Sequence, residues 1–278
     1  MKIKIAVVQF EIKQYAPEDN LKRAEGFINK ASLAKADIIV FPEDFITGPI
    51  AGKREFADSK NYYRKHFQYL AKKYKIDIVP GSLIEEDKSG LYNVSYYIDF
   101  LGQVKSQYRK INLWHPERSY LNPGYEVAVS NTKFGKVGLL ICWDLIFPEV
   151  FRKMAKIGVN LVICPSYWCY GDAGKIGNSY NKDSEINLVD SLCVGRAFEN
   201  EIAFVYCNAA GKLDLIKEKI RIQDTLIGHS QISVPFKGCI KRLEHNKEEM
   251  FIQELDTSIL NDSEVVYKIR KDLKNKWL

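Results

Sequence analysis

The sequence has no long apolar run, no paired-cysteine motif and no glycine-rich phosphate loop, and each absence excludes a class of protein. No stretch of 18 apolar residues occurs, so we expect no membrane-spanning helix. The opening MKIKIAVVQF has too short an apolar part for a secretion signal, and no small-residue cleavage site follows it. The six cysteines form no CxxC pair and have no metal-ligand spacing. We therefore expect reduced thiols in a cytoplasmic protein.

Concentrated charge is also missing. The formal net charge is +6, but lysines and acidic residues are interleaved along the whole length. No basic patch of the kind that binds nucleic acid is predicted, and no cofactor motif is present. The sequence also lacks a linker rich in proline, glycine or serine, and it has no internal repeat. A single domain over residues 1–278 that acts on a small molecule is the expectation.

Strand-like and helix-like segments alternate along the chain, with hairpins inserted between them. The predicted strands cover 3–10, 36–41, 76–80, 93–98, 103–108, 127–130, 136–142, 161–164, 202–208, 228–235, 239–243 and 251–255, the last two as a final hairpin. The predicted helices begin at Pro17 and cover 60–75, 148–156, 184–200 and a charged C-terminal tail. This alternation favours an α/β layered domain. Residues 166–183 are predicted to form a long polar loop, which is usually functional or mobile.

The stretch from Gly135 to Glu149 carries the strongest chemical signal. An apolar run, Val137 to Ile141, reads as a buried strand that stops at Cys142. Pro148 then stands where a helix would start. A cysteine on such a sharp bend is presented as a nucleophile is in a hydrolase elbow. The alternative is a small apolar residue that closes a core strand.

Two other polar residues stand at predicted strand ends. Glu43 follows IIVFP, and Lys110 follows the arm of the 93–108 hairpin. If both meet Cys142, the glutamate can take the thiol proton and the lysine can stabilise an oxyanion. The backbone N–H of Trp143 would be a second oxyanion donor. The alternatives are a carboxylate at a helix start and a solvated Arg-Lys pair.

The motifs around these residues resemble those of the nitrilase superfamily of carbon–nitrogen hydrolases. The matching segments are FPEDF (41–45), YRKINL (108–113), ERSYLNPG (117–124), ICWDLIFPE (141–149), NLVICPSYW (160–168), GRAFEN (195–200), YCNAAG (206–211) and GHSQISVP (228–235). The resemblance implies a four-layer α-β-β-α sandwich, no metal or other cofactor, and homodimers or larger homo-oligomers. We expect the C-terminal tail, about 256–278, to take part in oligomer contacts.

The resemblance also implies roles for individual residues. Glu43 would be the general base, Lys110 would stabilise the tetrahedral intermediate and Cys142 would be the nucleophile that forms a thioester. Glu117 would lie beside the nucleophile and orient the substrate or the lysine. Trp114, Trp143, Tyr167 and Trp168 are expected to wall the pocket, although aromatic residues beside strands are more often core. His115 and His229 could pair with a cysteine, but partly buried histidines without a base role are the favoured interpretation.

The sequence indicates the type of reaction more clearly than it indicates the identity of the substrate. Cys-Trp-Asp (142–144) differs from the Cys-Trp-Glu common in nitrilases, and ICWDLIFPE resembles the nucleophile segment of N-carbamoylputrescine amidases. The glycine-bearing segment that follows the lysine motif in those enzymes is missing here. The prediction is therefore a hydrolase of a small linear amide or N-carbamoyl compound that releases ammonia or an amine. The alternatives are nitrile hydrolysis and a catalytically silent member that binds a ligand or regulates a partner.

Overall fold

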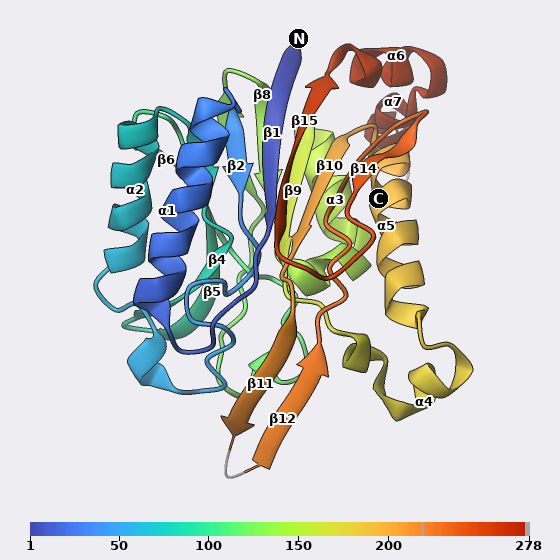
Figure 1. Cartoon of the computed structure of the whole chain (residues 1–278). Coiled ribbons are helices and arrows are strands. Elements are labelled where there is room, and N and C mark those ends of the chain that lie inside the picture. The colour runs from blue at the N-terminus through green and yellow to red at the C-terminus, as the bar shows by residue number, and fades with distance from the viewer. Residues whose placement is uncertain (218–219, 276–278) are drawn as a thin grey trace.

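Two β-sheets face each other at the centre of the molecule, and helices cover both outer faces (Figure 1). The structure, a computed structural model, describes residues 1–217 and 220–275. The first sheet has the strand order β15-β1-β2-β3-β5-β4, with β6 also paired to β5. Its strands are β1 (Lys2–Gln9), β2 (Ile38–Val40), β3 (Asp77–Val79), β4 (Ser82–Asp87), β5 (Gly90–Ile98), β6 (Val104–Arg109) and β15 (Glu249–Asp256).

The second sheet has the strand order β14-β13-β10-β9-β8-β7. Its strands are β7 (Ala128–Thr132), β8 (Gly135–Leu139), β9 (Leu161–Ser166), β10 (Ala203–Asn208), β13 (Gln231–Val234) and β14 (Gly238–Arg242). The strands β8, β9 and β10 run parallel, and β9 and β10 are buried along their whole length, which explains their largely apolar sequences. The ends of parallel strands meet at one edge of a sheet, so side chains that follow them can converge.

Helices α1 (Pro17–Leu33) and α2 (Tyr62–Tyr74) cover the first sheet, and α3 (Pro148–Ile157) and α5 (Ser184–Asn200) cover the second (Figure 1). These two helices pack against the first sheet through buried side chains such as Ala24, Ile28 and Phe67. Helices α6 (Ser258–Tyr267) and α7 (Ile269–Asn275) follow β15, as expected for the tail, of which residues 276–278 lie outside the described part. The four-layer α-β-β-α architecture implied by the resemblance is confirmed.

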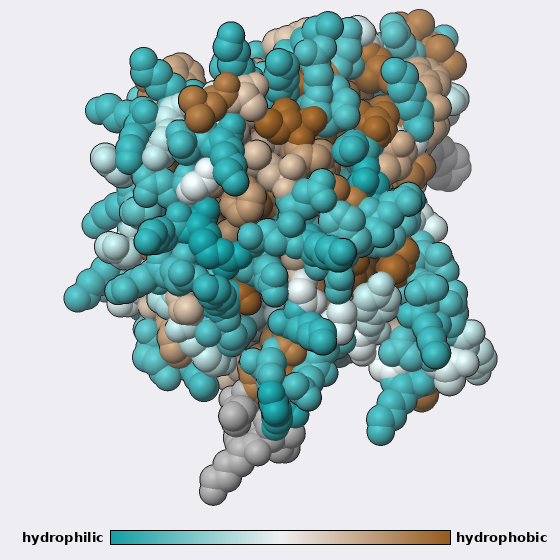
Figure 2. Space-filling view, viewed as in Figure 1, coloured by the Kyte–Doolittle hydropathy of each residue, from teal (hydrophilic) through white to brown (hydrophobic). Residues whose placement is uncertain are grey.

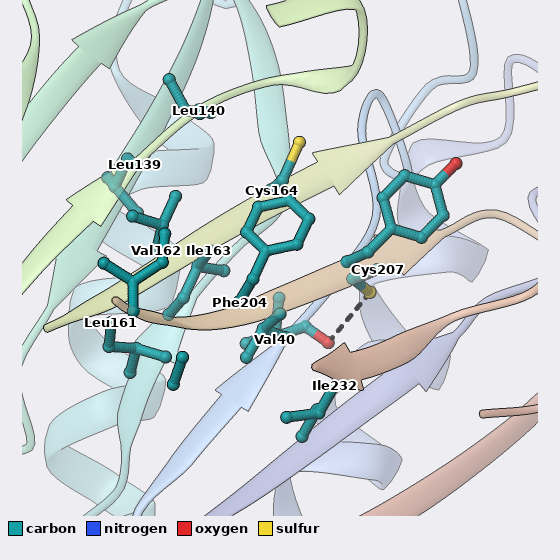
Figure 3. Close-up of a cluster of buried hydrophobic side chains, with 14 of the residues drawn as sticks. Val40, Leu139, Leu140, Leu161, Val162, Ile163, Cys164, Phe204, Cys207 and Ile232 are labelled. Carbon is teal, nitrogen blue, oxygen red and sulfur yellow. Dashed lines mark hydrogen bonds between the residues drawn. The ribbon is translucent and has the colours of Figure 1, made fainter. Parts of the chain in front are cut away.

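The space between the sheets is filled by one continuous apolar core (Figure 3). Side chains from β8, β9 and β10, including Leu139, Ile163 and Val205, face β1 and β2 there, whereas Phe204 points to the outer face and packs against Phe151 of α3. The thiol of Cys207 lies 3.6 Å from the carbonyl oxygen of Val40, so it joins a strand of one sheet to a strand of the other. Buried contacts of this kind fix how the two sheets face each other.

The structure contradicts two predictions about the chain's local structure. The segment 166–183 is not one loop, because it contains the short helices η4 (Tyr170–Ala173) and α4 (Gly174–Tyr180). Two glycines and the absence of any buried residue in α4 explain why no helical pattern was visible. The final hairpin is also wrong: β14 pairs with β13, whereas β15 crosses to the first sheet and pairs with β1. That crossing buries Phe251 and Leu255 in the core between the sheets.

Two features escaped the prediction entirely. One is β4, which pairs with β5. The other is a two-stranded ribbon formed by β11 (Lys212–Lys217) and β12 (Ile220–Thr225), which projects from one end of the sandwich (Figure 1). No helix within the described residues is long and apolar enough to cross a membrane. The surface in Figure 2 is mainly hydrophilic, with hydrophobic residues gathered over the region of α6.

Candidate active site

Cys142 stands on a strained bend after β8. The strand ends at Leu139, and Cys142 is the first residue of a short 3-10 helix, η3 (Cys142–Ile146). Its φ angle is +46°, a left-handed conformation that residues other than glycine rarely adopt. Such conformations persist where the surrounding structure fixes them, and they concentrate at functional sites. The thiol side chain is 7% exposed and lines a cavity.

The carboxylate of Asp144 holds this bend in place. It accepts hydrogen bonds from the backbone N–H of Ile141 at 3.0 Å, from the Tyr108 hydroxyl at 2.7 Å and from the backbone and side chain of Asn112, both at 2.9 Å. Burial raises the pKa of Asp144, and the Tyr108 hydrogen bond opposes the rise. Because Tyr108 is in the strand that leads to Lys110, Asp144 connects the nucleophile segment to the lysine segment.

Glu43 reaches the same cavity from the turn after β2. The turn passes very close to Gly81, where a Cβ atom would lie 1.8 Å from the carbonyl oxygen of Pro42. Gly81 also has φ +58°, so both space and conformation require glycine there. The backbone N–H of Glu43 donates to the carbonyl of Ser166 in β9, at 3.3 Å. The glutamate is thereby fixed between the two sheets, with 3% of its surface exposed.

Lys110 joins the two glutamates. Its Nζ lies 2.8 Å from Oε1 of Glu43, and 2.9 and 2.8 Å from Oε1 and Oε2 of Glu117. The lysine is 1% exposed and therefore fully desolvated. A buried cation is tolerated only when it is paired and hydrogen bonded. The carboxylates of Glu43 and Glu117 provide both the opposite charge and the hydrogen bonds. Two strand-end residues and Glu117 of η2 (Glu117–Ser119) thus form one ionic cluster beside Cys142.

Asn93 is a fourth member of this cluster that the sequence did not predict. Its Nδ2 donates to Oε1 of Glu43 at 2.9 Å and to Oε1 of Glu117 at 3.2 Å. Its own backbone carbonyl accepts a hydrogen bond from the N–H of Lys110, at 2.9 Å. The available signal was a polar residue in the middle of the buried apolar strand β5, where an unpartnered amide would be costly.

The cluster is buried away from water, so its charged groups shift one another's pKa values. Burial raises the pKa of Glu43, although Lys110 opposes the shift. Burial alone would lower the pKa of Lys110, but Glu117 and Glu43 outweigh it and hold that pKa well above its usual range. Burial and the nearby Glu43 raise the pKa of the Cys142 thiol. The thiol is therefore protonated at rest, beside a carboxylate with increased affinity for a proton.

The cavity has a volume of about 230 Å³, and aromatic side chains form part of its wall. Trp143 contacts Trp114 with ring centroids 4.4 Å apart, and Trp168 with centroids 5.6 Å apart. Tyr167 also lines the cavity, so all four aromatic residues predicted from the sequence are found there. The β11–β12 ribbon supplies an aliphatic part of the wall through Leu213, Leu215 and Ile222.

Neither candidate histidine reaches the cavity. His115 is exposed and packs its ring against Trp114, with centroids 4.8 Å apart. His229 is 9% exposed and its Nδ1 lies 3.2 Å from Asp190, in a cluster at β13. Within residues 1–217 and 220–275, no group of three or more His, Cys, Asp or Glu side chains is arranged to hold a metal ion.

The chain is similar in sequence and fold to known carbon–nitrogen hydrolases. The carbon-nitrogen hydrolase family model matches residues 4–261. A 2-oxoglutaramate amidase of Bacillus subtilis (strain 168) is 31% identical over 282 residues, which cover 98% of this chain and 100% of that protein. An N-carbamoylputrescine amidase of Oryza sativa subsp. japonica is 27% identical, over 98% of this chain and 91% of that protein.

A solved structure shares the fold. The carbon-nitrogen hydrolase from Helicobacter pylori G27 superposes with a TM-score of 0.89, and the match covers 98% of this chain and 95% of that chain at 21% identity. The family match therefore extends over nearly the whole sequence, and the resemblance seen in the motifs is confirmed. The chain belongs to the carbon–nitrogen hydrolase family of the nitrilase superfamily, and it is an enzyme.

Proposed function

We propose that this enzyme hydrolyses a small linear amide or N-carbamoyl compound through a thioester on Cys142. The observation that carries the proposal is the hydrogen bonding of Lys110 to both Glu43 and Glu117 in the wall of the cavity that contains the cysteine. This cluster supplies a base and a cation for the thiol. The names of relatives that act on 2-oxoglutaramate and N-carbamoylputrescine support an amide or carbamoyl group as the target.

Glu43 is the proposed proton carrier, and its two oxygens have different tasks. Oε1 accepts hydrogen bonds from both Lys110 and Asn93. This arrangement leaves Oε2 to receive the thiol proton. The Cys142 sulfur then bonds to the carbonyl carbon, whose π electrons move to the oxygen. The Lys110 ammonium and the backbone N–H of Trp143 would stabilise that oxyanion.

Collapse of the tetrahedral intermediate breaks the carbon–nitrogen bond. Glu43 returns its proton to the departing nitrogen, so ammonia or an amine leaves and a thioester remains. Water then attacks the thioester and gives its proton to Glu43. The Cys142 sulfur departs, regains a proton from Glu43, and the acid is released. Glu117 orients Lys110 throughout, because it holds the ammonium by both of its oxygens.

The test measures ammonia release and covalent adducts with a panel of linear amides, ureido compounds and nitriles. We expect turnover of an amide or ureido compound, with an acyl adduct on Cys142 seen by mass spectrometry and neither signal in Cys142→Ala. Turnover of nitriles alone would replace the proposal with nitrile hydrolysis. No turnover and no adduct in any class would favour a silent member that binds a ligand.

We propose further that residues 1–278 act as one cytoplasmic domain that forms a homodimer or larger homo-oligomer. The support is an exposed apolar surface at the C-terminal tail: Val265 and Val266 of α6 are 71% and 62% exposed. Phe236 and Tyr267 lie beside each other there, with ring centroids 5.1 Å apart, and both are partly exposed. Sedimentation analysis of the protein and of Val266→Lys tests this, because a monomeric wild type would contradict it.

A further inference from the structure

The cavity has a second set of carboxylates that the proposed chemistry does not use. Asp44, Asp172 and Asp224 all line it, and we call these three residues the acidic wall. Their charges meet near Tyr167: after burial and Cys169, these three carboxylates raise the pKa of its hydroxyl well above the usual range. The acidic wall therefore lies within one neighbourhood of the cavity.

Asp172 and Asp224 are each fixed through one oxygen. Oδ2 of Asp172 accepts a hydrogen bond from the N–H of Cys169, at 2.8 Å. Oδ1 of Asp224 accepts from the N–H groups of Gly171 and Thr225, at 3.1 and 2.7 Å. A Cβ on Gly171 would lie 2.1 Å from the other oxygen of Asp224, so glycine is needed for this close approach. The backbone thus positions both carboxylates but supplies no cation.

Asp44 gives independent evidence for a missing ligand group. Its side chain is 6% exposed, and its Oδ1 is buried without a hydrogen-bond partner among the described residues. Buried acceptors are nearly always satisfied, because loss of hydration is costly. Burial and the nearby Glu43 and Glu117 raise the pKa of Asp44 well above its usual range, so a positively charged donor that enters the cavity would both satisfy this oxygen and favour the ionised carboxylate.

The charges around the cavity indicate which kind of ligand group would donate to Asp44. Among the described residues that line the cavity, Lys110 is the single cation, and its ammonium is already bonded to Glu43 and Glu117. No ion pair within the described residues involves the acidic wall. A carboxylate on the substrate would be repelled here, whereas an ammonium group would supply both the charge and the donors.

We infer that the natural substrate carries a cationic amino group at the end remote from its amide or carbamoyl group, and that the acidic wall binds this amino group. The aliphatic side chains of Leu213, Leu215 and Ile222 then cover the methylene chain between the two ends. This inference rests on the proposed function for its reaction, but its binding can be tested separately. It assigns the β11–β12 ribbon a role in specificity.

Three amides of equal chain length provide the test. 5-Aminopentanamide, hexanamide and adipamate differ only in a terminal ammonium, methyl or carboxylate group. We expect kcat/KM for 5-aminopentanamide to exceed that for hexanamide by at least about tenfold, with adipamate lowest. Equal values, or a preference for either of the other two amides, would overturn the inference while leaving the proposed reaction intact.

A binding measurement keeps the inference testable if none of the amides is hydrolysed. Calorimetry on Cys142→Ala should show 5-aminopentanamide binding at least about tenfold more tightly than hexanamide. The double substitution Asp172→Asn and Asp224→Asn should reduce this ratio to about one. Asp214→Asn is the matched control, because Asp214 is on the same ribbon but is exposed and paired with Arg221. A ratio unchanged in the double variant, or lost equally in the control, would contradict the role of the acidic wall.

Discussion

The catalytic cluster and the acidic wall are parts of one cavity, but their charges are organised in opposite ways. In the cluster, Lys110 is held by two carboxylates, and Asn93 donates to both of them. In the acidic wall, backbone N–H groups hold Asp172 and Asp224, and none of the three carboxyls forms an ion pair with a described residue. The first arrangement is complete before a substrate arrives, as electrostatic preorganisation requires. The second is completed only by a ligand, which is how a pocket distinguishes one substrate from another.

The largest expected effect is a loss of turnover without a loss of substrate binding, which would show that the catalytic cluster and the acidic wall act independently. Cys142→Ala should lower turnover of any amide by more than about 10⁴-fold, because no other group can form the covalent intermediate. Binding of 5-aminopentanamide should persist, since the acidic wall is intact. Steady-state ammonia release and calorimetry measure the two properties on the same protein. Loss of binding together with turnover would show that the two regions are not independent.

Lys110→Met removes the cation from the cluster and leaves the methylene packing. We expect kcat to fall by about 10² or more through loss of the oxyanion partner. The unfolding free energy should fall by about 3–5 kcal/mol, because two buried carboxylates lose their counterion. Urea denaturation and kinetics measure the two effects. Lys110→Met with Glu117→Gln should regain part of the stability and none of the turnover; near-normal turnover in either variant would refute the role of Lys110.

Asn93→Asp makes the cluster more like the acidic wall by adding an unpaired acid. The pKa of Glu43 is already raised by burial and by Glu117, so another negative charge should raise it further. The acidic limb of the kcat/KM profile, which reports ionisation of the base, should move to higher pH, and kcat should fall about tenfold. Asn131→Asp is the control, because Asn131 is an exposed residue of β7. An unshifted acidic limb would contradict the electrostatic coupling between position 93 and Glu43.

The smallest effect concerns pH and the acidic wall. Burial raises the pKa of Asp172 to about 7, with Asp224, Glu185 and Glu43 adding to the rise and the N–H of Cys169 opposing it. Its carboxylate is charged above that pH, so binding of a cation should strengthen as pH rises through 7. The kcat/KM ratio of 5-aminopentanamide to hexanamide should increase several-fold over that interval. In Asp172→Asn the ratio should be flat; a slope that survives would assign it to another group.

Local patterns predicted the residues at strand ends and little else of the site. Glu43, Lys110 and Cys142 were visible because each follows a predicted strand, and side chains at strand ends can converge. Asn93 was missed because its partners come from distant parts of the chain. A polar residue inside a strand does not by itself indicate whether it is structural or belongs to a site. The ribbon was missed although Leu213 and Leu215 alternate with charged residues. The acidic wall needed the turn at Gly171, whose contact with Asp224 no local pattern contains.

The pairing of β15 with β1 has a consequence for how the protein is made. Eight consecutive residue pairs join the two strands, from Lys2 with Asp256 to Gln9 with Glu249. On the ribosome, β1 emerges first, and its outer edge stays unpaired until the rest of the sandwich has been translated. Open strand edges invite pairing with other chains. A chain stopped before residue 249 should therefore aggregate, because only β15 covers this edge of β1 and protects the nascent protein from such pairing.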